Sequence, residues 1–362
     1  DVIACMKEMG IQLLRWPGGN FAGEYYWKDG LLPRNMRSPL QSYLGIETQP
    51  HTTGYDYHEI NTDDFVALCR EIGAEPFITL NPTWCTPEES AQWVEYCNGD
   101  ETTEGGRARI ANGRIKPYHV RYWEMDNEMH RWFTDEEYAE ACVMYSRTMK
   151  AVDPTIKIGM ISYCSSIENL ARMVEIAGMD IDFLADRGFD EGELIRKLDI
   201  LHKFNEAHGT SIRYCNTEWL PLNGADVYNM VPRSETRQNK CFMFSKWSYA
   251  LDAAATLMMW QRYGQDIDFI NFNNFANTHS QSVIETPKEG AYVTSAGMML
   301  HRFANTEAYQ TLVLEDYHAK GIWDMNRAED HAREYIGQFQ DICGAEVIIH
   351  GFDIIPASRI RT

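Results

Sequence analysis

The sequence lacks the paired cysteines, the long apolar run and the excess of positive charge that several classes of protein require. Its nine cysteines include no CxxC pair, which argues against a disulfide scaffold or structural zinc and for reduced, mostly buried thiols. No stretch approaches the ~18 consecutive apolar residues of a membrane span. Because 53 acidic residues outnumber 33 basic ones, the net charge of -20 disfavours nucleic acid and anionic membranes as partners.

Aromatic residues, by contrast, are abundant and point to a neutral ligand. They make up 12% of the chain and include 10 Trp and 19 Tyr, whose flat rings can stack on sugars or nucleobases. The acidic charge favours sugars, and no diagnostic spacing of metal ligands is present, so we expect a carbohydrate partner and no metal or other cofactor. Cysteine usage favours the cytoplasm. The chain starts at Asp1 as if midway through a helix, so we expect a truncated N-terminus, which leaves a secreted protein open.

Strand-like and helix-like segments alternate along the chain, with a helix before the first strand. Apolar runs that end in polar or turn residues predict strands at 11–19, 75–82, 119–128, 156–162, 181–187, 211–219 and 268–277. Apolar residues at helical spacing predict helices at 61–73, 86–99, 134–154, 167–177, 191–208, 234–263 and 290–303. Repeated strand-helix units imply a parallel sheet, either doubly wound or closed as a barrel.

The ends of the predicted strands favour the barrel. A doubly wound nucleotide-binding fold would carry a glycine-rich phosphate turn after its first strand, whereas "RWPGGNF" has no such spacing. Barrel enzymes instead place polar residues after many strands. Such residues here are Asn20, Asn81, Asn127, Glu128, Ser162, Asp186, Arg187, Asn216, Glu218, Asn273 and Asn274. The sequence therefore predicts an α/β fold, with a (β/α)8 TIM barrel at 1–307 and a short α+β appendage at 308–362.

Two of these strand ends place a glutamate after an otherwise apolar strand, in "MDNEM" and "CNTEWL". Carboxylates from two strands that face one pocket are the minimum equipment for cleaving a glycosidic bond. The alternative is that Glu128 and Glu218 are surface acids or ion-pair partners, for instance of Arg15. Strand alternation also predicts that Glu124 and Asp126 point to one side and Asn127 to the other.

Four segments together resemble family-51 glycoside hydrolases, which are best known as α-L-arabinofuranosidases. These segments are "LLRWPGGNFAGEYYWKDGLLPRNMR", "WVEYCN", "VRYWEMDNEM" and "NTEW", and the resemblance covers roughly residues 1–305. It implies a retaining hydrolase in which Glu128 is the acid/base and Glu218 the nucleophile, with the two carboxyl groups ~5 Å apart. Arg15 would keep Glu218 ionised, while Asn127 and Asn20 would bind the sugar. Trp84 and Trp219 are candidate sugar platforms.

The chain departs from the family pattern at several positions. Asp126 stands where the family has glycine, and Thr217 where it has aspartate. Asp186 and Arg187 replace a His-Gln-Tyr motif, and Asn274 stands in for a sugar-binding glutamine, so we expect a rebuilt pocket. We therefore keep open a hydrolase of β-linked glucan or xylan, and a degenerate barrel that only binds carbohydrate.

Further expectations concern the N-terminal and C-terminal parts of the chain. The resemblance implies that the family's first strand lies upstream of Asp1, so either the sequence is a fragment or another segment replaces that strand. One hypothesis is that the segment 327–355 packs at the open edge in its place. The resemblance also implies a homo-oligomer, often a hexamer.

Overall fold

The computed structural model describes residues 1–41, 55–129, 132–162, 165–188, 190–220, 247–273, 275–277, 282–286 and 290–305. The segments 308–362 and 327–355, on which two of the expectations rest, lie outside these residues. None of the helices in the described ranges is long and apolar enough to span a bilayer. The six cysteines within these ranges are free, and five of them are buried.

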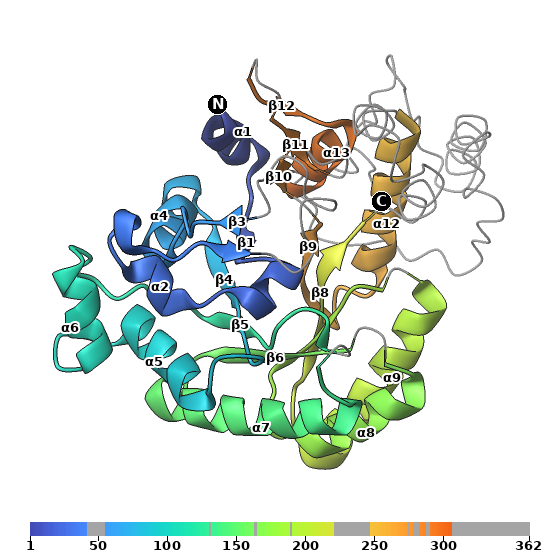
Figure 1. The fold of residues 1–362 in the computed structure, drawn as a ribbon. Coiled ribbons are helices and arrows are strands. Elements are labelled where there is room, and N and C mark those ends of the chain that lie inside the picture. The colour runs from blue at the N-terminus through green and yellow to red at the C-terminus, as the bar shows by residue number, and fades with distance from the viewer. Residues whose placement is uncertain are drawn as a thin grey trace.

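A sheet of parallel strands in the order β1-β4-β5-β6-β7-β8-β9 forms the centre of the molecule (Figure 1). The seven strands are β1 (Leu13–Trp16), β4 (Glu75–Thr79), β5 (Tyr122–Glu124), β6 (Lys157–Ile161), β7 (Phe183–Asp186), β8 (Arg213–Trp219) and β9 (Ile267–Phe272). Cα atoms of β1 and β9 come within 8 Å of each other, although no hydrogen-bonded ladder joins these strands in the part of the chain that is described. The sheet is a nearly closed barrel, which confirms the predicted fold.

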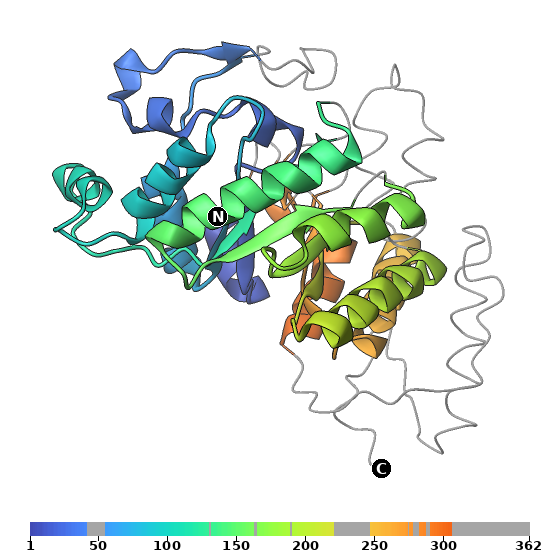
Figure 2. The ribbon, with the colours of Figure 1, turned by 90° about the horizontal axis from the view of Figure 1, so that it is seen from below.

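Helices connect the strands and cover the outside of the barrel, as Figure 2 shows from below. They are α1 (Val2–Met9), α4 (Thr62–Ile72), α5 (Pro87–Asn98), α7 (Asp135–Val152), α8 (Ile167–Ala177), α9 (Glu191–His208), α12 (Trp247–Arg262) and α13 (Ser295–Ala304). Capping boxes begin three of them, at Asn61, Thr86 and Thr134, because the side chain of each accepts a hydrogen bond from a backbone N–H of the first turn. These three predicted helix starts therefore agree with the structure. The start predicted at residue 234 lies outside the described residues.

The connections contain elements that periodicity did not predict. The helices α2 (Trp27–Leu31) and α6 (Glu104–Ala111), the 3-10 helices η1 (Asn20–Glu24) and η2 (Arg34–Met36), and the pair β2 (Leu40–Gln41) and β3 (Tyr55–Asp56) lie between the units. The expected strand 268–277 is wrong beyond Phe272. Its last residues form β10 (Ala276–Asn277), which pairs with β11 (Ile284–Glu285), and β11 pairs with β12 (Tyr292–Val293). The final helix was predicted to begin at residue 290, but β12 occupies Tyr292–Val293 and the helix begins at Ser295.

Aromatic rings fill the interior of the barrel. Phe77, Tyr122, Phe183 and Phe269 come from four different strands and contact one another with centroids 5.1–6.4 Å apart. We call these four residues the aromatic layer. Side chains alternate along a strand, so Thr79 and Glu124, two residues beyond Phe77 and Tyr122, also point inward. They are register partners on β4 and β5, and they begin a polar layer above the rings.

Candidate active site

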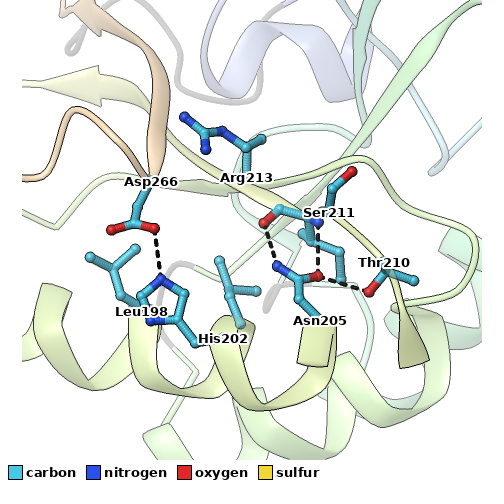
Figure 3. Close-up of a pocket in the computed structure, with 9 residues that line it drawn as sticks. Leu198, His202, Asn205, Thr210, Ser211, Arg213 and Asp266 are labelled. Carbon is cyan, nitrogen blue, oxygen red and sulfur yellow. Dashed lines mark hydrogen bonds and ion pairs between the residues drawn. The ribbon is translucent and has the colours of Figure 1, made fainter. Parts of the chain in front are cut away.

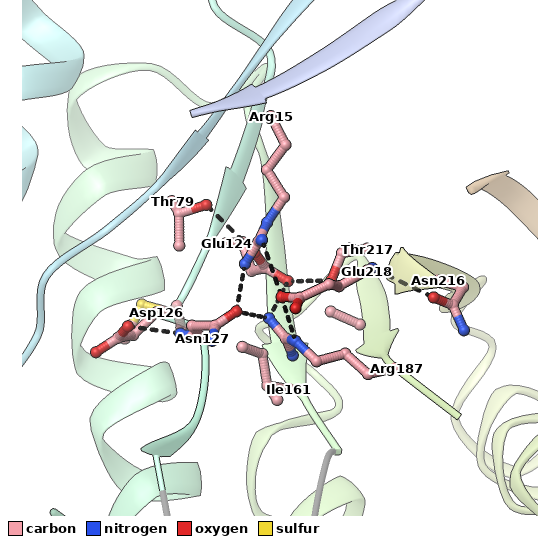
Figure 4. A network of polar contacts seen from close by, with 12 residues as sticks. Arg15, Thr79, Glu124, Asp126, Asn127, Ile161, Arg187, Asn216, Thr217 and Glu218 are labelled. Carbon is pink, nitrogen blue, oxygen red and sulfur yellow. Dashed lines mark hydrogen bonds and ion pairs between the residues drawn. The ribbon is translucent and has the colours of Figure 1, made fainter. Parts of the chain in front are cut away.

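Glu124 lies at the centre of the polar layer and is fully buried. Its Oε2 accepts hydrogen bonds from Arg15 Nε at 2.5 Å and from Thr79 Oγ1 at 3.3 Å, while its Oε1 accepts one from Thr217 Oγ1 at 2.5 Å (Figure 4). Charge-assisted hydrogen bonds of this kind offset much of the free energy needed to bury a carboxylate. Glu124 is thus a fixed negative charge below the predicted catalytic pair.

Two guanidinium groups meet at Glu218. Arg187 Nε donates to Glu218 Oε2 at 3.1 Å, and Arg15 Nη1 lies 3.6 Å from the same oxygen. The side chains of Arg15 and Arg187 are only 8% and 5% exposed, whereas that of Glu218 is 22% exposed. Positive charges in a poorly hydrated site stabilise the ionised form of a neighbouring carboxylate. Arg15 therefore lies where the sequence predicted it, and Arg187 adds a second positive charge.

Asn127 joins the two arginines and precedes the second predicted carboxylate. Its Oδ1 accepts hydrogen bonds from Arg15 Nη2 at 2.9 Å and from Arg187 Nη2. Glu128, the next residue, is half-buried. Burial lowers the pKa of Arg187, but the charges of Glu124, Glu218 and Glu128 outweigh burial and raise that pKa above its usual value. Both predicted catalytic glutamates therefore interact with one guanidinium group.

The end of β8 is irregular, and this irregularity sets the direction of Glu218. The pairing of β8 with β9 shifts register between Tyr214 and Asn216, and again between Asn216 and Trp219. Asn216 Oδ1 accepts a hydrogen bond from Glu218 N at 3.2 Å, and Asn216 Nδ2 donates to Gly188 O at 2.6 Å. Register shifts of this kind commonly redirect a side chain beside an active site.

The loop after β1 brings Gly19 against Asn127 and Glu218. The Trp16–Pro17 peptide bond is cis, and Gly18 has a φ of 115°, a conformation that L side chains rarely adopt. A Cβ atom at Gly19 would lie 3.6 Å from both Asn127 Nδ2 and Glu218 Oε2. The amide nitrogen of Asn127 and the carboxylate of Glu218 therefore face the same space.

The expectation from strand alternation is wrong beyond Glu124. Asp126 has a φ of 63°, so the chain turns sharply and does not continue as a strand. As a result, Asn127 lies against the same arginines as Glu124, and Asp126 points away from them (Figure 4). The positive φ also gives a physical reason for the glycine that the resemblance implies at this position.

Three predicted site residues instead have structural contacts. Asn81 is buried, and its amide bonds to Tyr25 O and to Trp84 N, so it holds a loop. Asp186 is buried between Lys197 Nζ at 2.8 Å and Tyr214 OH at 2.7 Å. Trp219 is fully buried with its ring edge-on to Phe272, so it offers no exposed face to a sugar. Burial and these contacts explain all three differences from the prediction.

Three other predicted residues have different outcomes. Trp84 is 68% exposed and follows β4, at the same end of the barrel as Glu218, so it stays a candidate platform. Asn20 begins η1, directly after the loop of β1. Asn274 lies outside the described residues.

Sequence reasoning underrated Glu124 and gave no role to Thr79 and Thr217. One signal was available for Glu124, since it is a charged residue in the middle of the aromatic and apolar run "YWEM". What connects these residues is the register of the strands, and a single sequence does not give it. Within the described ranges, no group of three or more His, Cys, Asp or Glu side chains is placed to hold a metal ion.

A pocket of about 220 Å³ lies at the opposite end of the barrel (Figure 3). It is lined by residues of α9 such as Leu198 and His202, and by Arg213 and Asp266, which lie where β8 and β9 begin. His202 Nε2 is 2.7 Å from Asp266 Oδ1. Active sites of such barrels lie at the carboxyl ends of the strands, so this pocket is separate from the candidate site.

A parallel barrel with one glutamate at the end of a strand and another in the turn that follows a different strand, both at its carboxyl end, is typical of glycoside hydrolases. The family model described as "Alpha-L-arabinofuranosidase 1 domain" matches residues 5–189. The chain therefore belongs to the α-L-arabinofuranosidase family, family 51 of the glycoside hydrolases.

Individual relatives agree with this family. A probable alpha-L-arabinofuranosidase C of Aspergillus clavatus is 38% identical over 167 residues, which are 44% of this chain and 31% of the relative. An intracellular exo-alpha-L-arabinofuranosidase of Bacteroides ovatus is 35% identical over 129 residues, which are 35% of this chain and 24% of that protein. The arabinose complex of the Thermotoga maritima alpha-L-arabinofuranosidase has a TM-score of 0.70 and 26% identity, covering 84% of this chain and 63% of the other.

The alignments cover only part of these proteins. The matched segment spans about a third of the Aspergillus clavatus relative, at 31% of its length. The activity and substrate of the whole protein therefore belong to the proposal that follows.

Proposed function

We propose that this chain is the catalytic barrel of a retaining α-L-arabinofuranosidase. The observation that carries the proposal is the contact of Arg187 and Arg15 with one oxygen of Glu218, at 3.1 and 3.6 Å. The two guanidinium groups hold the carboxylate of Glu218 at the carboxyl end of the barrel, where it is the proposed nucleophile. Glu128, which follows the turn after β5, is the proposed acid. Family membership supplies the sugar, because the matched family model and the relatives are arabinofuranosidases.

The proposed reaction has two displacements. Glu128 donates its proton to the glycosidic oxygen while a carboxylate oxygen of Glu218 bonds to the anomeric carbon, and the bond from that carbon to the leaving alcohol breaks. In the second step Glu128 takes a proton from water, whose oxygen displaces Glu218 from the anomeric carbon. Glu218 leaves as a carboxylate and Glu128 is again protonated, so the sugar is released with its configuration retained.

Asn127 is the proposed donor to a sugar hydroxyl group. Both arginines bond to its Oδ1, which fixes the amide plane and turns Nδ2 toward the space shared with Glu218. A donor fixed in this way forms its bond to the substrate without reorganising, which lowers the barrier when the bond strengthens in the transition state.

The proposed substrates are the arabinofuranosyl side chains of plant arabinan and arabinoxylan. The exposed indole of Trp84 is the proposed platform for the polysaccharide outside the cleaved bond.

The proposed domains are the catalytic barrel at residues 1–307 and the appendage at 308–362. The protein would also be a homo-oligomer, which light scattering of the purified protein tests.

Hydrolysis of an aryl α-L-arabinofuranoside, measured beside β-glucan and xylan oligosaccharides, tests the proposed activity. We expect release of the aryl group by the wild-type protein and at least a ~10³-fold loss in Glu218→Gln, because the nucleophile is removed. If the protein cleaves only β-glucan or xylan, arabinofuranose is not its substrate and the alternative hydrolase activity is correct. No cleavage of any of these substrates would contradict the hydrolase proposal.

A further inference from the structure

Asp126 has a conformation that needs an explanation. It is 3% exposed and has a φ of 63°, which is uncommon for a residue with a side chain. Its N–H donates to Glu124 O at 3.0 Å, which closes a tight turn directly after β5. This turn redirects the chain just before Asn127 and Glu128.

The carboxyl group of Asp126 is held from two sides. Oδ1 accepts a hydrogen bond from the backbone N–H of Asn127 at 2.6 Å. Oδ2 lies against Gly23 of η1, so closely that a Cβ atom at position 23 would be 2.9 Å from it. Real Cβ contacts of that length are essentially absent from proteins, so glycine is required at position 23 as long as Asp126 keeps its place.

We propose that Asp126 is a positioning residue that directs Asn127 and Glu128 into the site, through its left-handed backbone and its carboxyl group held between Asn127 N and Gly23. The inference rests on the proposed function, because it gives Asp126 its role in the same reaction. Asp126 acts through Asn127 and Glu128 and does not itself touch the substrate. A small shift of either residue would misplace the donor or the acid.

The surroundings of Asp126 also give it a titration near neutral pH. Burial raises the pKa of its carboxyl group to about 7, opposed by the hydrogen bond from Asn127 N and by the charge of Arg187. The other charged groups that act on it are Glu124 and Arg15, and η1 contributes Glu24, whose pKa burial also raises to about 7. The negative charge of an ionised Asp126 opposes loss of the proton from Glu128. Without that charge, we expect Glu128 to lose its proton at lower pH.

Two substitutions at position 126 separate geometry from charge. Asp126→Gly permits the positive φ but removes the carboxyl group, and we expect kcat to fall ~100-fold with little change in KM. Asp126→Asn keeps an oxygen acceptor for Asn127 N and should restore most of this loss. The basic limb of its pH profile of kcat/KM should lie at lower pH than in the wild type.

Gly23→Ala tests the same contact from the opposite side. The new methyl group should displace the Asp126 carboxyl group and reduce kcat about as much as Asp126→Gly does. The double variant Gly23→Ala/Asp126→Gly should be no slower than either single variant, because both changes remove one interaction. Fully additive losses, or an unchanged kcat in Asp126→Gly, would overturn the inference.

A crystal structure of Asp126→Gly separates this inference from the proposed function. The inference predicts that Asn127 and Glu128 shift relative to the wild-type protein while the barrel does not. Unmoved side chains would refute the positioning role. This result stands whether or not the wild-type protein cleaves an arabinofuranoside, whereas an inactive wild type contradicts only the proposed function.

Discussion

Glu124 is the buried negative charge that holds the two arginines of the site. Its side chain is 0% exposed and lies 2.5 Å from Arg15 Nε and 3.8 Å from Arg187 Nη2. Glu124→Gln keeps the shape but removes the charge, so two buried guanidinium groups would share only Glu218. We expect a loss of about 3–5 kcal/mol in the free energy of unfolding, measured by urea denaturation, together with reduced kcat.

The matched control for Glu124→Gln is Glu140→Gln, an exposed position on α7. Its free energy of unfolding should stay within about 0.5 kcal/mol of the wild-type value. Equal stability of the two variants would show that Glu124 does not support the arginines.

Arg187 depends on its shape as well as its charge. Its Nε donates to Glu218 and its Nη2 donates to Asn127, which a single ammonium group cannot reproduce. Arg187→Lys should therefore reduce kcat by at least ~10-fold even though the charge is kept. Arg213→Lys, at the opposite end of the barrel, is the control and should leave kcat unchanged. Wild-type kcat in Arg187→Lys would contradict the proposed role of the guanidinium fork.

Some side chains of the site could be placed from the sequence, and others could not. Asn127 and Glu218 could be placed at one end of the barrel, because polar residues that follow apolar strands meet there. The position of Arg15 beside Glu218 was implied by the family resemblance. The positive φ of Asp126 and the burial of Trp219 could not be predicted, because the first depends on the contact with Gly23 and the second on packing against Phe272.

Among the elements, β6 has room only for glycine at position 159, because the aromatic layer packs against it. A Cβ atom at Gly159 would overlap the ring of Phe183. Gly159→Ala should therefore lower the free energy of unfolding by about 1–3 kcal/mol, measured by urea denaturation, because the core is overpacked. The second change in Gly159→Ala/Phe183→Leu should recover part of this loss.

Gly192 in the first turn of α9 is the control for Gly159. Only side-chain atoms at 3.3 Å or more surround its Cβ position, so Gly192→Ala should be neutral or slightly stabilising. A Gly159→Ala variant as stable as Gly192→Ala would show that the aromatic layer is not tightly packed.

Helices were more predictable than strand ends for a local reason. The capping boxes at Thr86 and Thr134 involve residues three apart, so the sequence contains the whole interaction. The strand β5 spans only Tyr122–Glu124 within the expected 119–128, because the turn at Asp126 and the pairing partners end it. The pairing partners of β5 are β4 and β6, which are distant in sequence, so local sequence patterns do not show where β5 ends.

For the whole molecule, the net charge of -20 disfavours polyanionic partners and is compatible with the neutral sugar that we propose as substrate. Interactions between exposed charges are screened by salt, but the contacts of a neutral sugar are not. We therefore expect kcat/KM for an uncharged aryl arabinofuranoside to change less than about twofold between 0.05 and 0.5 M NaCl. A steep fall with salt would show that exposed charges of the protein contribute to turnover of the neutral sugar, and it would contradict this expectation.

The central claim is that Glu218 forms a covalent bond with the sugar, and mass spectrometry tests it most directly. The protein is incubated with a mechanism-based arabinofuranoside that slows the second displacement, digested and mapped. We predict one added glycosyl group, on the peptide that contains Glu218, and none in Glu218→Gln. An adduct on another residue, or turnover without any adduct and with inverted configuration, would contradict the assignment.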